Sequence, residues 1–302
     1  MPGRAASPGP GAIFLLTDYG LQDEFVGMLH AAIRRLAPLA PVVDLTHGIP
    51  PFDVVAGSRA LVRCAPHLGP GVLVGVVDPG VGTARRPVAL GCPGRPGPGG
   101  PTGPTRLVGP DNGLLLGAAE VLGGVVEAVE LPRPTRSVTF DGRDVFAPAA
   151  ARLWAGEPLG ALGPPLDPVS LVDLPSPWLA SGEGWLEAEV LWVDRFGNLQ
   201  LAARPEDLAD AGLGSAGVVL LEHPGGQQPL VRVGAFEELR QYRAPHGAPA
   251  LGLLVDANGQ LAVVEDRGSA ASTLGLAAGQ RLRLRGAPGA PPERDPWAQE
   301  AR

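Results

Sequence analysis

Cysteine and histidine are scarce in this 302-residue chain. Its two cysteines, Cys64 and Cys92, are far apart and match no zinc-binding spacing, and the sequence alone gives no ground for a disulfide. The five histidines include no pair spaced four residues apart, so no metal site is expected. A reduced cytoplasm is the simplest setting for such a chain.

Long apolar runs and clusters of positive charge are also lacking. No stretch approaches ~18 consecutive apolar residues, and the first residues lack the apolar core of a signal peptide, so no membrane span is expected. The formal net charge is −7 and no run of lysine or arginine is visible, so nucleic-acid binding is not expected. The glycine patterns of dinucleotide-binding and P-loop proteins are missing as well.

Glycine (44) and proline (35) are abundant and indicate many tight turns. Between these turns, the first half of the chain alternates apolar strands with amphipathic helices, which predicts an α/β domain with a largely parallel sheet. The tract 91–104, rich in proline and glycine, is interpreted as a surface loop between two short strands. The predicted elements are strands at 12–17, 42–45, 72–77 and 125–131 and helices over 25–36, 53–64, 113–122 and 146–155.

The pattern changes after a linker at 174–178. Short strands separated by turns follow, which predicts a smaller antiparallel barrel or sandwich. We therefore expect an N-terminal α/β domain over 11–174, a C-terminal domain over 182–286 and a disordered tail over 287–302. The predicted C-terminal strands lie at 185–193, 218–221, 230–233, 253–255, 261–264 and 282–284.

Acidic residues stand in or directly after the first three predicted strands, at Asp18, Asp44 and Asp78. Ligands of open α/β sheets collect at the carboxyl ends of strands, so these positions are candidates for a site. Each also has a structural interpretation. Asp18 could cap the following helix, and Asp44 could bond local backbone.

Seven segments occur in an order and spacing that resemble a known family. They read LLTDYGLQDEFVGMLHAAI, VVDLTHGIPPFDV, VVDPGVGTARRP, GPDNGLL, TFDGRDVFAPAAARL, VDRFGNLQL and EDRGSAASTLGL. Together they resemble the S-adenosyl-L-methionine (SAM) hydrolases that form adenosine, also called SAM hydroxide adenosyltransferases, which are related to SAM-dependent fluorinating and chlorinating enzymes. The resemblance implies an N-terminal α/β domain, a C-terminal β-barrel and a homotrimer with sites at subunit junctions. It also implies hydrolysis of SAM to adenosine and L-methionine without a metal or redox cofactor.

The resemblance implies that Asp78 and Arg85 hold the attacking water. The turn between these two residues would let both side chains face one water molecule. The third member of the family's set is a histidine in a TFHGRD motif, and here that position is Asp141. An aspartate there could accept a proton from water, or its charge could crowd Asp78 and raise one pKa. Arg85 or Arg143 would offset that charge. Arg86 is expected to be solvated.

Substrate-binding roles are also implied by the resemblance. In the N-terminal domain, Asp18 would bind the ribose hydroxyls, Asp23 would order the loop that carries Asp18, and Phe140 would pack on the ribose or the sulfur side. In the barrel, Asp194 would pair with the methionine ammonium, Asn198 would bind the adenine edge, and the loop with Ser269 and Ala270 would meet adenine through its backbone. The PDNG segment, with Asp111 and Asn112, is expected to be a structural turn.

Two alternatives to hydrolysis follow from Asp141. The chain could be a SAM- or adenosine-binding protein that has lost activity, or a transferase that uses another nucleophile. Halide is the less favoured nucleophile, because the halogenating relatives carry an aromatic residue where this chain has Asp78.

Overall fold

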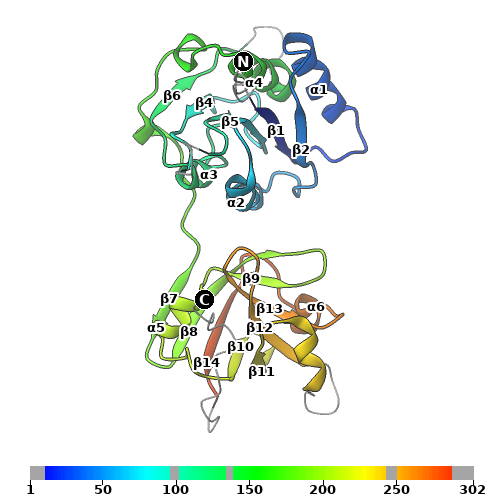
Figure 1. The fold of residues 1–302 in the computed structure, drawn as a ribbon, viewed down its shortest axis with the longest axis vertical. Helices are drawn as coiled ribbons and strands as arrows, with labels where there is room; N and C mark the ends of the chain where they lie inside the picture. The colour runs from blue at the N-terminus through cyan, green and yellow to red at the C-terminus, as the bar shows by residue number, and fades with distance from the viewer. Residues whose placement is uncertain (1–10, 96–101, 134–138, 243–249, 288–302) are drawn as a thin grey trace, which may run out of the picture. The chain divides into compact units, whose positions relative to one another are not determined.

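The computed structural model describes residues 11–95, 102–133, 139–242 and 250–287. Within them the chain forms two compact units, divided between Leu174 and Pro175 (Figure 1). The predicted tail lies outside the described residues except for residue 287, and so does the middle of the predicted loop at 91–104.

The first unit is built on a six-stranded sheet with the order β2-β1-β3-β5-β4-β6. All neighbours are parallel except β4, which runs antiparallel to both β5 and β6, so the predicted mostly parallel sheet is confirmed. Its strands are β1 (Ala12–Thr17), β2 (Val42–Thr46), β3 (Gly71–Val76), β4 (Pro87–Gly91), β5 (Arg106–Pro110) and β6 (Glu127–Glu130).

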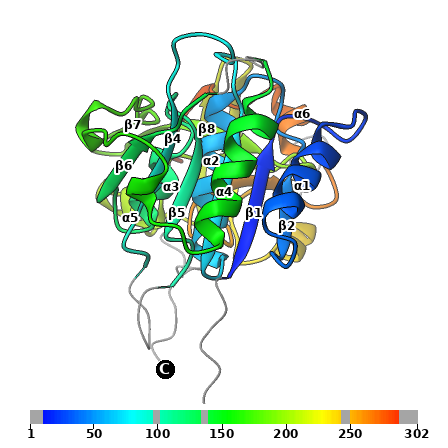
Figure 2. The same ribbon diagram turned by 90° about the horizontal axis from the view of Figure 1, so that it is seen from above.

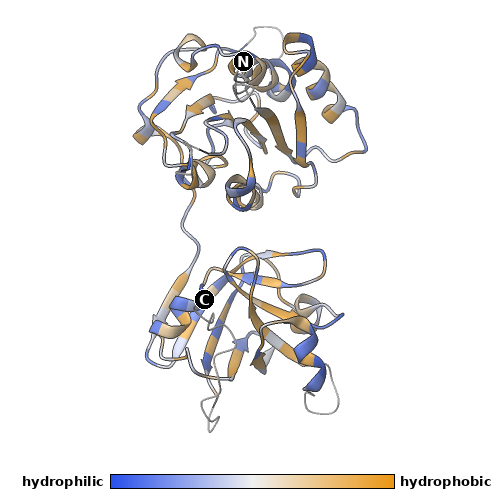
Figure 3. Cartoon of the chain, viewed as in Figure 1, coloured by the Kyte–Doolittle hydropathy of each residue, from blue (hydrophilic) through white to orange (hydrophobic). Residues whose placement is uncertain are grey.

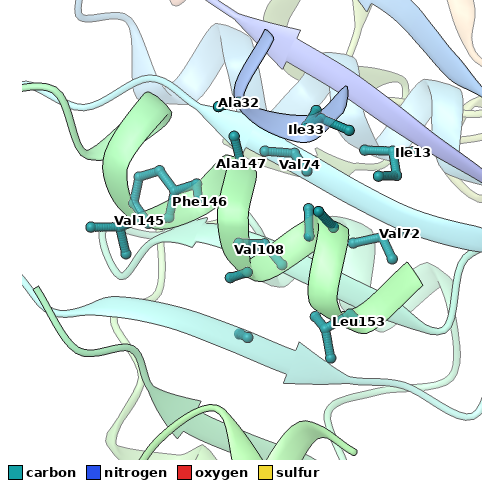
Figure 4. Packing of buried hydrophobic residues seen from close by; sticks show 14 of the residues in the cluster. Ile13, Ala32, Ile33, Val72, Val74, Val108, Val145, Phe146, Ala147 and Leu153 are labelled. Atoms are coloured by element: carbon teal, nitrogen blue, oxygen red, sulfur yellow. The ribbon is translucent and has the colours of Figure 1, made fainter. Parts of the chain in front are cut away.

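Helices cover both faces of this sheet, which explains why β1 and β3 are apolar along nearly their whole length. On one face, Ile13 and Val74 pack with residues of α1 (Phe25–Leu36) and α4 (Ala147–Trp154), including Ile33 and Ala147 (Figures 2 and 4). Figure 3 shows the hydrophobic residues along β1, which lies between β2 and β3.

The opposite face packs alternate residues of the same strands, such as Phe14 and Leu73, against α2 (Val54–Cys64) and α3 (Leu116–Val121). Asp53 accepts a hydrogen bond from the Ala56 amide and caps α2, as predicted.

The order of strands places a topological switch between β1 and β3. From β1 the chain crosses by α1 to β2 on one side, then returns by α2 to β3 on the other side of β1. Because these two helices cover opposite faces, a crevice opens beyond the carboxyl ends of β1 and β3. Asp18 directly follows β1, and Asp78 follows β3 with Val77 between them, while Thr17 is paired in register with Val76.

The second unit is a closed β-barrel. Its eight-stranded sheet has the order β14-β10-β11-β12-β13-β9-β8-β7, and β14 also pairs with β8, which closes the ring and leaves β7 outside it. The elements are β7 (Leu179–Gly182), β8 (Trp185–Val193), β9 (Leu199–Leu201), α5 (Pro205–Asp210), β10 (Val218–His223), β11 (Gly226–Arg232), β12 (Leu251–Val255), β13 (Leu261–Glu265), α6 (Ala270–Leu274) and β14 (Arg281–Gly286).

The predicted barrel is confirmed with two differences. Strands β11 and β12 are parallel, while the other pairs are antiparallel. The sequence also did not reveal β7 and β9, because both are too short to show a clear alternation. In β8 every second residue from Leu186 to Val190 is buried, as expected for a strand with one face in the core.

Among the described residues, no helix has the length and apolar character needed to cross a membrane.

Candidate active site

A pocket of about 230 Å³ lies at the switch point of the first unit. Its polar lining includes Asp18, Tyr19, Asp78 and Asp141. Phe25, Pro51, Phe52, Val76, Val81 and Gly142 supply the rest. The predicted acids Asp18, Asp78 and Asp141 are therefore brought together from three distant parts of the sequence.

The bend between Asp78 and Arg85 pairs the two side chains directly. Arg85 Nε donates to Asp78 Oδ1 at 3.0 Å, and Arg85 Nη2 donates to Asp78 Oδ2. The bend is fixed from within, because the Gly80 amide donates to Asp78 Oδ1 at 3.2 Å and the Thr83 hydroxyl donates to the Gly80 carbonyl at 2.7 Å. Two parallel hydrogen bonds hold this ion pair in one geometry.

Asp141 joins the same cluster. Arg85 Nη2 also donates to Asp141 Oδ2 at 2.8 Å, so one guanidinium bridges two carboxylates. The side chain of Asp141 is 1 % exposed, and those of Arg85 and Asp78 are each 7 % exposed. Asp141 is anchored because it directly precedes a π-helical turn (Gly142–Phe146) whose Val145 and Phe146 lie in the core (Figure 4).

Two buried polar atoms of this cluster have no hydrogen-bond partner within the described parts of the chain. They are Arg85 Nη1, which is a donor, and Asp141 Oδ1, which is an acceptor. Buried polar groups are normally hydrogen-bonded, so the cluster retains one donor and one acceptor whose hydrogen-bonding capacity is unused.

Burial raises the pKa of Asp78 above its ordinary value, and the neighbouring charge of Asp141 adds to this effect, while Arg85 opposes it. Burial likewise raises the pKa of Tyr19, with further contributions from Asp18, Asp78 and Asp141. Tyr19 therefore stays protonated over the physiological range and presents a neutral hydroxyl.

Gly142 permits this position of Tyr19. A Cβ added to Gly142 would lie 2.2 Å from Tyr19 Oη, well inside the closest distance that such atoms reach. The glycine after Asp141 is therefore required by the close approach of a tyrosine side chain to the backbone.

Asp18 lines the pocket and is bonded to Phe52, another residue of the pocket lining. Its Oδ2 accepts a hydrogen bond from the Phe52 amide at 2.9 Å, so it bonds the loop before α2 and does not cap α1. Phe52 has a φ of 67°, which is rare for an aromatic residue, and its side chain is 70 % exposed. Phe52 therefore lines the pocket as an exposed residue with a strained backbone.

Arg85, Phe140 and Asp23, the other predicted residues of this domain, are not among the residues that line the pocket. Phe140 packs against the rings of Tyr19 and Phe25, with centroids 5.8 Å and 5.3 Å apart. Asp23 is exposed in the loop before α1.

The cation that supports Asp141 besides Arg85 is Arg133, not Arg143. Arg133 Nε donates to Asp141 Oδ2 at 3.2 Å. Arg143 instead donates twice to its neighbour Asp144, at 2.7 Å for each bond. Arg133 gave no signal in the sequence because it stands in a proline-containing loop outside the seven family segments. Tyr19 and Phe52 were not predicted as pocket residues, although each lies in one of those segments.

Two other expectations were wrong. Arg86 is not simply solvated, because its Nε donates to Asp111 Oδ2 at 2.8 Å and its Nη1 donates to the Ser170 hydroxyl at 3.2 Å. Asp44 does not bond local backbone but lies against two histidines, with Oδ1 2.9 Å from His30 Nε2 and 3.1 Å from His47 Nε2.

The two histidines also affect the charge state of Asp44. Burial acts to raise the pKa of Asp44, but hydrogen bonds from both histidines outweigh burial and leave that pKa below its ordinary value. No group of three or more His, Cys, Asp or Glu side chains within the described ranges is arranged to hold a metal ion.

In the second unit, the four predicted residues come together in one cluster. Asp194 Oδ2 accepts from Asn198 Nδ2 at 2.8 Å, and Ser269 Oγ accepts from the Ser272 amide at 3.1 Å at the start of α6. The loop with Asp194 and Asn198 contacts the start of α6, because the Ala271 amide donates to the Gly197 carbonyl at 2.9 Å. A Cβ on Gly197, whose φ is 84°, would lie 2.0 Å from Ser269 Oγ, so this contact requires glycine.

Comparison with known families agrees with both units. The SAM hydroxide adenosyltransferase N-terminal domain matches residues 13–163, and the C-terminal domain of the same family matches residues 188–283. The chain therefore belongs to the SAM hydroxide adenosyltransferase family.

Individual relatives cover most of the chain. It is 44 % identical to the (R)-S-adenosyl-L-methionine hydrolase of Salinispora arenicola, over 90 % of this chain and 97 % of that protein. It is 30 % identical to the fluorinase of an Actinoplanes species, over 68 % of this chain and 76 % of that protein. A crystal structure of an uncharacterized conserved protein from Thermotoga maritima superposes with a TM-score of 0.79 at 29 % identity, covering 90 % of this chain and 99 % of that one.

Proposed function

We propose that this protein hydrolyses SAM to adenosine and L-methionine, with water attacking the ribose 5′-carbon on the side opposite the sulfur. Family membership supports this reaction, as does 44 % identity to a protein named (R)-S-adenosyl-L-methionine hydrolase. The pocket at the switch point is lined by three acids, two of which are bridged by Arg85, and it is the proposed place of the chemistry.

The reaction balances without a further reactant. A bond forms between the water oxygen and the 5′-carbon, and the bond between that carbon and sulfur breaks with its electron pair going to sulfur. The sulfonium thereby becomes the neutral thioether of methionine, which is a good leaving group, so no cofactor is part of this proposal. One proton of the water must go to a base.

Asp78 is the proposed base. It lines the pocket, and burial raises its pKa, which makes it a stronger base than an ordinary aspartate. Its pairing with Arg85 holds the carboxylate in one orientation, which favours a reaction that depends on the line of attack.

The observation that carries the proposal is the pair of unsatisfied atoms, Arg85 Nη1 and Asp141 Oδ1. A water that accepted a hydrogen bond from the first and donated one to the second would satisfy both groups, and Asp78 belongs to the same cluster. Such positioning can contribute up to about 7–11 kcal/mol to lowering a barrier. A guanidinium beside the water also favours its more hydroxide-like form.

The remaining residues are proposed to bind substrate. Asp18 would accept hydrogen bonds from the ribose hydroxyls, Phe140 would support the aromatic wall of the pocket, and Asp23 would order the loop before α1. Asp194 is proposed to bind the methionine ammonium, and Asn198 is proposed to bind the adenine edge. The backbone at Ser269 and Ala270 is proposed to meet adenine.

Assembly and location form a further part of the proposal. The family resemblance supports a homotrimer, and the scarcity of cysteine supports a location in the reduced cytoplasm. Multi-angle light scattering of the purified protein measures the oligomeric state directly. A mass near three times 30.9 kDa is expected, and a monomer mass would exclude the trimer.

The test of the function is incubation of the purified protein with SAM in water labelled with a heavy oxygen isotope. Adenosine carrying one labelled oxygen is expected, since the water oxygen becomes the 5′-hydroxyl. Asp78→Asn is the matched control and is expected to form adenosine much more slowly.

Tight binding of SAM without adenosine would instead indicate a binding protein. A 5′-substituted adenosine formed when chloride or another anion is added would indicate a transferase.

A further inference from the structure

Arg133 links the two halves of the acid cluster. It follows β6, and besides its bond to Asp141 Oδ2 it donates from Nη1 to the Thr83 carbonyl at 2.8 Å and from Nη2 to the Arg85 carbonyl. One side chain therefore contacts Asp141 and the backbone of the bend that carries Asp78 and Arg85.

Arg133 also balances the charge of the cluster. Asp78 and Asp141 are both almost fully buried, and Arg85 alone would leave two carboxylates to share one cation. With Arg133, whose side chain is 25 % exposed, two carboxylates face two guanidinium groups. Buried charges without a partner are costly, so the second guanidinium lowers the cost of burying two carboxylates side by side.

The contacts of Asp141 are unevenly divided between its oxygens. Oδ2 accepts from both Arg85 Nη2 and Arg133 Nε, while Oδ1 has no partner among the described residues. Two donors on one oxygen hold the carboxylate plane in place, and the hydrogen-bonding capacity of the other oxygen, which is also buried, stays unused among the described residues.

We propose that Arg133 is a positioning residue of this active site. It fixes the Asp141 carboxylate with Oδ1 available to the attacking water, and it supplies the second positive charge that allows Asp78 and Asp141 to be ionised side by side. This inference rests on the proposed hydrolysis and adds to it a residue that acts through Asp141 without contacting substrate.

The proposal makes a specific claim about pH. Removal of Arg133 leaves the charge of Asp141 less neutralised, and that charge raises the pKa of Asp78. The acid limb of the kcat/KM profile should then move to higher pH. The charged and titratable groups that surround the cluster are Asp78, Arg85, Asp141, Arg133, Tyr19 and Asp18.

The experiment compares Arg133→Gln with the unsubstituted protein. We expect the acid limb to move up by about one pH unit. We also expect kcat at neutral pH to fall about tenfold and KM for SAM to change much less, because the substrate contacts are intact. Arg152→Gln is the matched control: Arg152 pairs with Glu157 in the same unit, outside the cluster, and its loss should leave the pH profile unchanged.

A double-mutant comparison separates positioning from general stability. In an Asp141→Asn background the charge that acts on Asp78 is gone, so adding Arg133→Gln should cause no further shift of the acid limb. Arg133→Lys keeps a cation, so the acid limb should stay at the same pH while kcat falls. This variant replaces Arg133→Gln if the glutamine variant does not fold. An unchanged acid limb in Arg133→Gln, or an equal shift in the asparagine background, would overturn the inference.

The outcome can be distinguished from failure of the proposed function. If the unsubstituted protein forms no adenosine, hydrolysis is wrong, while carbon NMR of labelled aspartate still measures the pKa of Asp78 with and without Arg133. An equal pKa in both proteins would reject the charge-balancing role independently of any activity.

Discussion

Arg85 and its neighbour Arg86 bind different carboxylates in different parts of the domain. Arg85 bridges the two buried acids of the pocket, Asp78 and Asp141. Arg86 binds Asp111 and Ser170, which lie at the turn before α3 and in the loop at the end of the unit. Two adjacent arginines therefore have separate roles, one in the site and one in the scaffold, and each role can be tested.

Replacing Arg85 with alanine is expected to lower kcat by at least about 100-fold, because the donor to the water and the shared partner of two carboxylates are both removed. SAM should still bind, since the proposed substrate contacts lie elsewhere. Single-turnover kinetics measures the loss of turnover, and calorimetric titration measures the binding of SAM. Equal turnover in the variant would remove Arg85 from the mechanism.

Replacing Arg86 with alanine is expected to lower the free energy of unfolding by about 2–3 kcal/mol, because the side chain of Asp111, which is 4 % exposed, loses its charged partner. The folded fraction should retain nearly normal turnover. Urea denaturation and activity per folded molecule provide the two measurements. Loss of turnover without loss of stability would contradict the separation of roles.

The pH dependence of kcat/KM should show an acid limb that belongs to Asp78. The ionised carboxylate is the active form, so activity falls as the pH falls through its pKa. Because burial raises that pKa above its ordinary value, the loss occurs at higher pH than for an exposed aspartate. Circular dichroism at each pH separates this limb from acid unfolding, and a limb at or below the ordinary value would contradict the assignment.

Gly142 and Tyr19 should show coupled effects. Gly142→Ala places a methyl group against the Tyr19 hydroxyl and is expected to cost about 1–3 kcal/mol of stability and to disturb the pocket. In the double variant with Tyr19→Phe the hydroxyl is absent, so most of the stability should return. Thermal unfolding of the two single variants and the double variant measures the coupling, and strictly additive losses would count against the contact.

The main layers of the fold could be predicted from the sequence because burial leaves a local pattern. Continuous apolar runs such as 12–17 and 72–77 predict strands covered on both faces, and the change of pattern near 174–178 predicts a second unit. The short strands β7 and β9 were missed, because three or four residues give no reliable period.

The candidate site was predictable to a lesser degree. Asp18, Asp78 and Asp141 were recognised from strand ends and motifs, and the structure places all three around one pocket. The supporting partners were not predictable, because Arg133 is 48 residues from the backbone oxygen that it binds at Arg85, and Arg86 is 84 residues from Ser170. No local rule of spacing connects such positions.

The sequence by itself determined which segments become strands and helices, and it placed acids after β1 and β3, since apolar periodicity and turn chemistry act over a few residues. Only the tertiary structure decided which cation faces which acid. That choice depends on the order of strands in the sheet and on the side chains that burial brings together, and it gave Asp141 the partners Arg85 and Arg133 in place of its sequence neighbour Arg143.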